Sequence, residues 1–120
     1  MNILVVLENN TGTLHRLSLE AIVGSQKLGE SVSVLLIGEG AEGIINQLKN
    51  YDLEKIITVK HELLASYNAD GYSETVKQVA LSISPNVITA GHTYQTRDYM
   101  PRVSAKLGAP FIPDVIAANG

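Results

Sequence analysis

The 120-residue chain contains no cysteine and no tryptophan, and only 5% of its residues are aromatic. The absence of cysteine excludes disulfides, thiolate metal ligands, iron–sulfur clusters and thiol nucleophiles. Any redox role must therefore use a bound cofactor. The low aromatic content argues against an aromatic stacking platform for single-stranded nucleic acid.

The chain also lacks an excess of positive charge and long hydrophobic runs. Nine Lys and Arg against 12 Asp and Glu give a formal net charge of −3, which argues against broad electrostatic capture of nucleic acid or anionic lipid. The longest aliphatic runs, residues 3–7 and 34–37, are far shorter than the ~20 residues that cross a membrane. The first residues carry neither the basic segment nor the cleavage site of a signal peptide. We therefore predict a cytoplasmic protein with no nucleic-acid partner and no membrane insertion.

Short β-rich runs alternate with segments of helical periodicity. Strands are expected at 3–7, 32–37, 55–59, 86–90 and 115–117. Helices are expected over 14–28, 44–52, 72–83 and 98–107, with residues 62–70 as a loop. Because the strands are apolar throughout, they belong in a sheet that is covered on both faces. The pattern predicts one doubly wound α/β domain over residues 1–120, Rossmann-like, with a mainly parallel five-stranded sheet in the order 3-2-1-4-5.

The last expected helix contains a proline, Pro101. If Asp98 caps this helix, Pro101 lies in the first turn. A missing amide costs little there, because the first helical amides have no intrahelical partner. We therefore expect the helix to begin near Asp98.

Polar residues follow the first and fourth strands. In an open parallel sheet of this order, the ligand crevice lies beyond the carboxyl ends of these two strands. Asn9 and Asn10 after the first strand, and His92 and Thr93 after the fourth, are candidate ligand-binding residues. The alternative is that they only turn and cap the backbone, as Asn, Thr and Gly commonly do.

Residues 38–43 read G-E-G-A-E-G and satisfy the spacing of a dinucleotide-binding loop. However, Glu39 and Glu42 would place two carboxylates beside a pyrophosphate at a helix amino terminus that should attract anions. The segment also follows the second strand rather than the first. We therefore do not assign dinucleotide binding to it.

No other segment predicts a catalytic or metal site. His15, His61 and His92 lie in separate segments without the spacing of metal ligands. Asp98 and Asp114 are explained by helix capping and strand-end solvation. The chain contains no nucleophile-elbow, Walker A or zinc-protease motif. We therefore predict no catalytic residue and no bound metal.

The segment 97–106 holds three of the nine basic residues: Arg97, Arg102 and Lys106. Their spacing places them roughly on one broad face of a helix. This face is either an ordinary solvated surface or a docking surface, since the planar guanidinium of arginine suits interface carboxylates.

Residues 91–108, GHTYQTRDYMPRVSAKLG, resemble a motif of the electron transfer flavoprotein alpha subunit. That family typically reads G-x-[ST]-x-x-G-R-D-L-x-P-R-[VI]-A-A-[RK]-L. The opening residues 3–8, ILVVLE, and residues 114–116, DVI, are also similar to the family. The sequence departs from the motif at Thr96, where the family has glycine, and at Tyr99 and Met100, which replace a leucine and a small residue.

The resemblance implies a heterodimeric electron carrier, not an enzyme, that takes electrons from flavoprotein dehydrogenases and passes them towards the respiratory chain. It implies a beta-subunit partner that binds AMP. It also implies that FAD is held mainly by a carboxyl-terminal domain outside this chain. Carried over by position, Arg97, Asp98, Pro101 and Arg102 serve as scaffold and as an intersubunit docking motif. The alternative from the residues alone is a free-standing nucleotide-binding module that uses the crevice at Asn9, Asn10, His92 and Thr93.

Overall fold

The computed structural model describes residues 2–10, 13–14, 16–28, 31–37, 41–48, 51–60, 67–91, 94–108, 111–112 and 115–117. The elements are β1 (Asn2–Leu7), β2 (Asn9–Asn10), β3 (Thr13–Leu14), α1 (Arg16–Leu28), β4 (Ser31–Ile37), α2 (Ala41–Gln47), β5 (Lys55–Val59), α3 (Ala69–Ile83), β6 (Val87–Ala90), α4 (Tyr94–Leu107), β7 (Phe111–Ile112) and β8 (Val115–Ala117). No helix in these described segments is long and apolar enough to cross a membrane.

Six of the described strands form one sheet in the order β5-β4-β1-β6-β8-β7. The first four pair in parallel, and they are the third, second, first and fourth strands that the sequence predicts. Strands β8 and β7 are antiparallel to their neighbours. The α/β class with a mainly parallel sheet is therefore confirmed. The count of five strands was wrong, because the two-residue strand β7 is too short to leave a pattern in the sequence.

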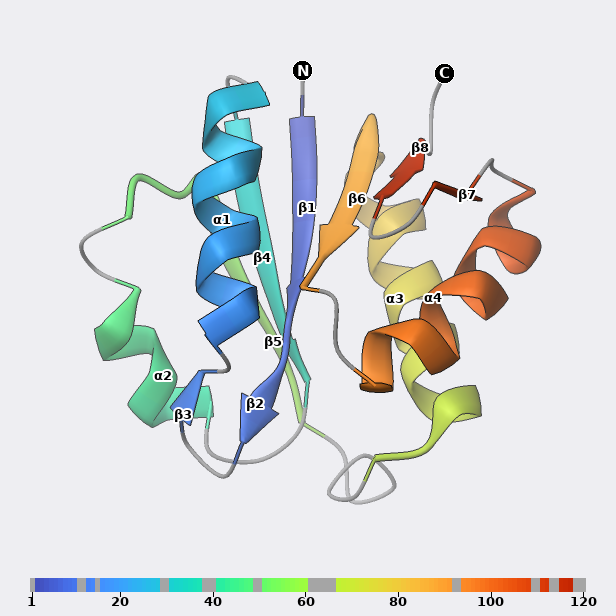
Figure 1. Ribbon diagram of the computed structural model, residues 1–120, viewed down its shortest axis with the longest axis horizontal. Helices are drawn as coiled ribbons and strands as arrows, with labels where there is room; N and C mark the ends of the chain where they lie inside the picture. Colours follow the sequence, from blue (N-terminus) through green and yellow to red (C-terminus); the bar gives the residue numbers. More distant parts are fainter. Residues whose placement is uncertain are drawn as a thin grey trace.

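Helices cover both faces of the sheet, with α1 and α2 on one face and α3 and α4 on the other (Figure 1). Successive residues of a strand point to opposite faces, so the continuous apolar run of β1 serves both. Ile3, Val5 and Leu7 pack with Ile22 of α1 and Ile44 of α2. The alternating residues of β1 belong to the second cluster, whose helical members include Val76, Ala80, Tyr99, Met100 and Val103.

The edge strand β5 is covered less completely than the central strands. Ile57 and Val59 pack against the α3/α4 cluster. Ile56, whose side chain points to the opposite face, is 38% exposed. The expectation that every apolar strand is covered on both faces is therefore wrong for β5, because the apolar run of an edge strand can include residues that the helices do not reach.

Each of the four described helices has at least one boundary that differs from the sequence expectation. Leu14 lies in β3, which pairs with β2 as a short antiparallel ladder, so α1 begins at Arg16 rather than at Leu14. Helix α2 ends at Gln47 and does not continue to Asp52. Helix α3 begins at Ala69, inside the segment expected to be a loop.

The early start of α3 has a local cause. Asn68 has extended backbone angles, and its side-chain oxygen accepts a hydrogen bond of 2.6 Å from the amide of Gly71. This side chain satisfies one of the amides that a helix leaves unpaired at its start, and Asp70 adds a favourable negative charge in the first turn. At the other end, the helix closes at Ser84, as expected, with a left-handed C-cap whose amide bonds to the carbonyl of Ala80.

The start of α4 also differs from the sequence expectation. It begins at Tyr94, four residues before Asp98, so Pro101 lies in the helix interior rather than in the first turn. An interior proline removes one helical hydrogen bond and strains the preceding turn. The burial of Tyr99, Met100 and Val103 in the α3/α4 cluster offsets this loss. Tertiary packing therefore overrides the local signal from proline.

Candidate functional site

The crevice expected at the carboxyl ends of two strands is partly outside the described residues. Strands β1 and β6 are adjacent and parallel, as the expectation requires. Asn9 and Asn10 form β2, whose backbone pairs with β3. His92 and Thr93 lie outside the described residues. The geometry therefore places the two strands together and leaves the nucleotide-binding role of these four residues untested.

A group of three tyrosines occupies the α3/α4 side of the sheet: Tyr67, Tyr72 and Tyr99. Tyr67 and Tyr72 meet edge to face with ring centroids 4.9 Å apart, and the ring of Tyr99 lies 5.8 Å from that of Tyr72. Such offset or edge arrangements are the favourable geometries for aromatic pairs. Tyr99, which replaces the leucine of the family motif, is a core residue with only 2% of its surface exposed.

The tyrosines have raised pKa values. Burial is the main cause for the phenol of Tyr99, and the negative charge of Glu8 raises its pKa further. Burial also raises the pKa of Tyr72, again with a contribution from Glu8. These phenols therefore stay neutral at physiological pH, and they act as packing and hydrogen-bonding groups rather than as charges.

Tyr67 connects the start of α3 to the first turns of α4. Its hydroxyl donates a hydrogen bond of 2.7 Å to the carboxylate of Asp98. Burial and this hydrogen bond raise the pKa of Tyr67. Asp98 is therefore not the N-cap that the sequence indicated. It is the acceptor that holds the 67–68 segment against α4.

Thr96, where the family motif has glycine, lies in the first turn of α4. It is buried, with 3% of its surface exposed. Its hydroxyl donates a hydrogen bond of 2.5 Å to the carbonyl oxygen of Gly91, directly after β6. This hydrogen bond ties the first turn of α4 to the end of β6. The departure at Thr96 therefore has a defined structural role.

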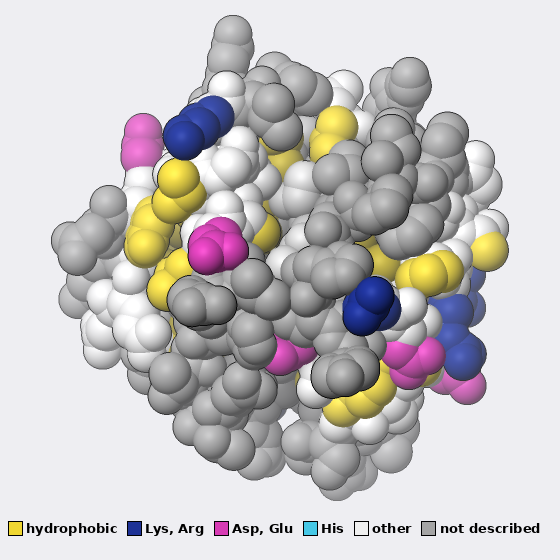
Figure 2. All heavy atoms as spheres, viewed as in Figure 1, with side chains coloured by type: hydrophobic (Ala, Val, Ile, Leu, Met, Phe, Trp, Pro, Cys, Tyr) yellow, Lys and Arg dark blue, Asp and Glu magenta, His cyan; other side chains and the backbone are white. Residues whose placement is uncertain are grey.

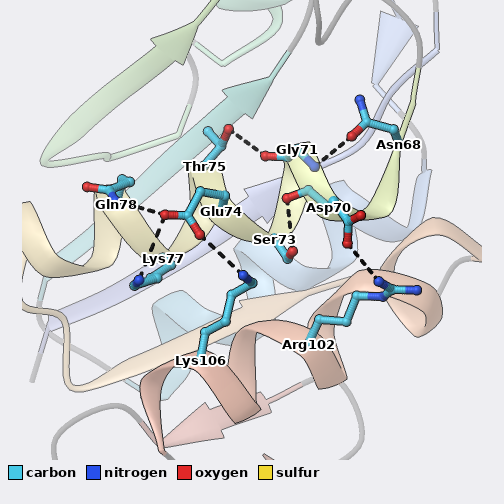
Figure 3. Close-up of polar contacts among 10 residues, drawn as sticks. All are labelled: Asn68, Asp70, Gly71, Ser73, Glu74, Thr75, Lys77, Gln78, Arg102 and Lys106. Carbon is cyan, nitrogen blue, oxygen red and sulfur yellow. Dashed lines mark hydrogen bonds and ion pairs between the residues drawn. The ribbon is translucent and has the colours of Figure 1, made fainter.

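Two ion pairs link α3 to α4, and Figure 3 shows both side by side. Arg102 binds Asp70 at 2.8 Å, and Lys106 binds Glu74 at 3.3 Å. Glu74 also accepts a hydrogen bond from Gln78. The hydrogen bonds from Gln78 and Lys106, together with the charge of Lys77, lower the pKa of Glu74.

The basic residues of segment 97–106 therefore do not act as one surface. Arg102 and Lys106 are engaged by carboxylates of α3. Arg97 is exposed and forms no ion pair with any described residue. In the space-filling view, charged side chains of both signs gather over the edge of the molecule formed by α4 and α3 (Figure 2).

Sequence reasoning missed the residues of α3 that hold α4. Asp70 and Glu74 are spaced four apart, as are Arg102 and Lys106. Residues four apart share a helix face, so the two opposite-charge pairs could have been matched. Tyr67 left no comparable signal, because its contact with Asp98 joins positions 31 residues apart.

Most of the other candidate residues cannot be placed in the fold. Residues 38–40 of the glycine-rich segment, the three histidines and Asp114 lie outside the described residues. Among the residues that the structure does describe, no group of three or more His, Cys, Asp or Glu side chains could hold a metal ion.

Comparison with known proteins identifies the family. Residues 3–119 match the electron transfer flavoprotein domain. The chain belongs to the electron transfer flavoprotein family. The resemblance carried by residues 91–108 is thereby confirmed, and the family assignment is favoured over the alternative of an unrelated nucleotide-binding module.

Three relatives illustrate the breadth of this electron transfer flavoprotein match. The alpha subunit of Bacillus subtilis is 32% identical over 117 residues, covering 95% of this chain and 36% of that protein. The probable mitochondrial alpha subunit of Caenorhabditis elegans is 30% identical, covering 93% and 34% respectively. The acryloyl-CoA reductase electron transfer subunit beta of Anaerotignum propionicum is 32% identical, covering 88% and 30%. The chain therefore spans about a third of the length of these curated relatives.

Proposed function

We propose that this chain is the amino-terminal domain of an electron transfer flavoprotein alpha subunit, and that it acts as a scaffold and a docking domain for a beta subunit. The carrying observation is the family match over residues 3–119, together with relatives that are named alpha subunits. In this role the domain performs no catalysis. It supports FAD-mediated electron transfer from flavoprotein dehydrogenases towards the respiratory chain in the cytoplasm.

The proposal places the cofactors outside the described site. FAD is held mainly by a carboxyl-terminal domain of the alpha subunit rather than by residues 1–120, and AMP is held by the beta partner. No cluster of metal-ligating side chains occurs in the described residues. The four motif residues Arg97, Asp98, Pro101 and Arg102 provide the scaffold and the docking surface.

The placement of FAD is tested by purifying the chain and recording its visible spectrum. We expect no stoichiometric flavin absorbance, and we expect none to appear after incubation with FAD and gel filtration. A one-to-one flavin complex of residues 1–120 alone would contradict the assignment of FAD to a carboxyl-terminal domain.

The docking role is tested by co-expression with the electron transfer flavoprotein beta subunit of the same organism. We expect the two chains to co-purify as a one-to-one complex in size-exclusion chromatography with light scattering. As a control, an unrelated α/β protein of similar size carries the same affinity tag. Failure of the wild-type chain to bind the beta subunit would contradict the docking role.

A further inference from the structure

Tyrosine is the side chain of this chain that gives up a single electron most readily. Tryptophan, cysteine and tyrosine are the residues that one-electron oxidants usually attack, and the chain contains five tyrosines but no tryptophan and no cysteine. Three of the five, Tyr67, Tyr72 and Tyr99, form the tyrosine cluster on the α3/α4 side of the sheet. Most of the readily oxidised side chains are therefore gathered in one place.

The three rings are close enough to exchange an electron directly. The ring centroid of Tyr72 lies 4.9 Å from that of Tyr67 and 5.8 Å from that of Tyr99. The centroids of Tyr67 and Tyr99 are 6.3 Å apart. These separations are those of aromatic rings in direct contact. Because Tyr99 is buried and Tyr67 is half-buried, an electron vacancy that arises inside the cluster can reach a ring next to the surface.

Tyr67 carries its own proton acceptor. Its hydroxyl donates a hydrogen bond of 2.7 Å to the exposed carboxylate of Asp98. By contrast, Glu8 acts on Tyr72 and Tyr99 through its charge. A phenol becomes a strong acid when it loses an electron, so its oxidation is easiest where a base already holds the hydrogen. The cluster is therefore arranged to lose an electron at Tyr67.

We propose that Tyr67 and Asp98 form a redox site at which a strong one-electron oxidant takes an electron while the phenolic proton moves to the carboxylate. The O–H bond of Tyr67 breaks, and a bond forms between the proton and Oδ2 of Asp98. The products are a neutral phenoxyl radical, a carboxylic acid and the oxidant reduced by one electron. The missing cysteines favoured redox chemistry through a bound cofactor, and a phenol bonded to a base is an exception to that expectation. This redox role is additional to the proposed scaffold role and needs neither the beta subunit nor FAD.

The test uses the full chain with Tyr51→Phe and Tyr94→Phe as the reference chain, so that every remaining phenol belongs to the cluster. A laser flash generates tris(bipyridine)ruthenium(III), with a pentaamminecobalt(III) complex as the sacrificial electron acceptor. Transient absorption follows the phenoxyl radical, and electron paramagnetic resonance identifies it as a neutral tyrosyl. We expect the radical to form more slowly in heavy water, because the O–H bond breaks as the electron leaves.

Asp98→Asn separates the base from the hydrogen bond. The amide oxygen of asparagine can still accept from Tyr67, but it does not take up the proton. We expect radical formation to slow by roughly tenfold or more, since a positioned base commonly contributes at least that much to a proton transfer. The matched control is Asp52→Asn, which makes the same change of charge at an exposed position outside α3 and α4. We expect it to alter the rate by less than about twofold.

Two further variants locate the radical within the cluster. Tyr67→Phe leaves two phenols in place but removes the one bonded to Asp98, so we expect the yield of radical to fall by roughly tenfold or more. Tyr72→Phe also removes one phenol, and we expect a yield within about twofold of the reference chain. Circular dichroism and melting curves show whether each variant keeps the fold, and Asp98→Asn remains a complete test where Tyr67→Phe does not fold.

Each outcome has a defined meaning. An unchanged rate in folded Asp98→Asn, or equal slowing in Asp98→Asn and Asp52→Asn, would overturn the role of Asp98 as the base. Equal yields in folded Tyr67→Phe and Tyr72→Phe would overturn the site itself, as would a reference chain that forms no phenoxyl radical or shows no isotope effect. Failure to bind the beta subunit bears on the proposed function alone, because the flash experiment contains no beta subunit.

Discussion

The two faces of the sheet are built differently. On the α1/α2 face, aliphatic side chains such as Ile22, Ile44 and Leu48 pack directly on the strands. The α3/α4 face adds three tyrosines to its core and links its two helices by ion pairs. The first arrangement buries the sheet. The second also fixes the orientation of α4, whose exposed side carries the family motif.

The two faces therefore combine apolar burial with directional contacts to different extents. Non-directional burial supplies stability on either face. Hydrogen bonds and ring contacts are directional, and those between α3, α4 and Tyr67 restrict how the two helices lie on the sheet. The α1/α2 face also has directional contacts, such as the buried side-chain hydrogen bond between Ser25 and Thr89 at 2.8 Å.

The largest expected effect tests the aliphatic face. Ile22 is fully buried between α1 and the sheet, so Ile22→Ala removes apolar contacts and leaves a cavity. We expect the free energy of unfolding to fall by about 2–5 kcal/mol in urea denaturation. The control is Val23→Ala on the same helix, where Val23 is 42% exposed. Equal losses in the two variants would contradict the packing described for this face.

The next effect tests the polar pair on that face. Ser25→Ala removes one partner of a buried hydrogen bond and leaves the hydroxyl of Thr89 unsatisfied, so we expect a loss of about 1–3 kcal/mol. Replacing both residues, as Ser25→Ala with Thr89→Val, removes both polar groups and should cost clearly less than the sum of the single changes. Additive losses in this cycle, measured by urea denaturation, would show that the pair is not coupled.

The tyrosine cluster is expected to make stability sensitive to alkaline pH. The folded-state pKa values of Tyr67 and Tyr99 are raised, whereas an unfolded tyrosine titrates near pH ~10. The cluster's contribution is therefore complete below pH ~10 and is lost as the pH rises above it. The buried Tyr99 should remove up to about 1.4 kcal/mol per pH unit in that range. Tyr67 should remove less, because it is more accessible to solvent, which screens its interaction with Asp98.

The measurement compares the pH dependence of unfolding in wild type and in Tyr99→Phe between pH 9 and 11. We expect the variant to lose less stability per pH unit than wild type. Tyr51→Phe is the matched control, because it removes a phenol that packs on the other face. If Tyr51→Phe reduced the loss of stability per pH unit as much as Tyr99→Phe, the alkaline sensitivity would not come from the tyrosine cluster.

The smallest expected effect concerns the ion pairs. The side chains of Arg102 and Asp70 are 49% and 91% exposed, so solvent screens their attraction. We expect a double-mutant cycle with Asp70→Asn and Arg102→Gln to give a coupling free energy below about 1 kcal/mol, and still smaller in 1 M NaCl. A coupling as large as the loss from Ile22→Ala would mean that this pair, rather than apolar packing, stabilises the α3/α4 face.

Much of the fold could be predicted because its signals are local. The continuous apolar run of residues 3–7 indicated a central strand, and the helical period of residues 72–83 indicated α3. The start of α4 could not be predicted in the same way. Pro101 and Asp98 both suggested a later start. In the fold Asp98 accepts a hydrogen bond from Tyr67, and Thr96 is buried in the first turn of the helix, so contacts distant in sequence set this region.

The candidate site shows the same limit. The motif at residues 97–102 identified α4 as the segment of interest, but its spacing could not show which basic residues are engaged. That depends on Asp70, Glu74 and Tyr67, which are about 30 positions away in the chain. The role of Asn9, Asn10, His92 and Thr93 stays a prediction.

Composition, apolar runs and one motif were sufficient to indicate the α/β class and the family, because these are properties of short stretches of chain. The packing of α3 against α4 decided which charges of the two helices form ion pairs with each other. The physical reason is that an ion pair or a ring contact depends on the distance between side chains in space. That distance is set by how whole elements pack, not by the residues that adjoin them in sequence.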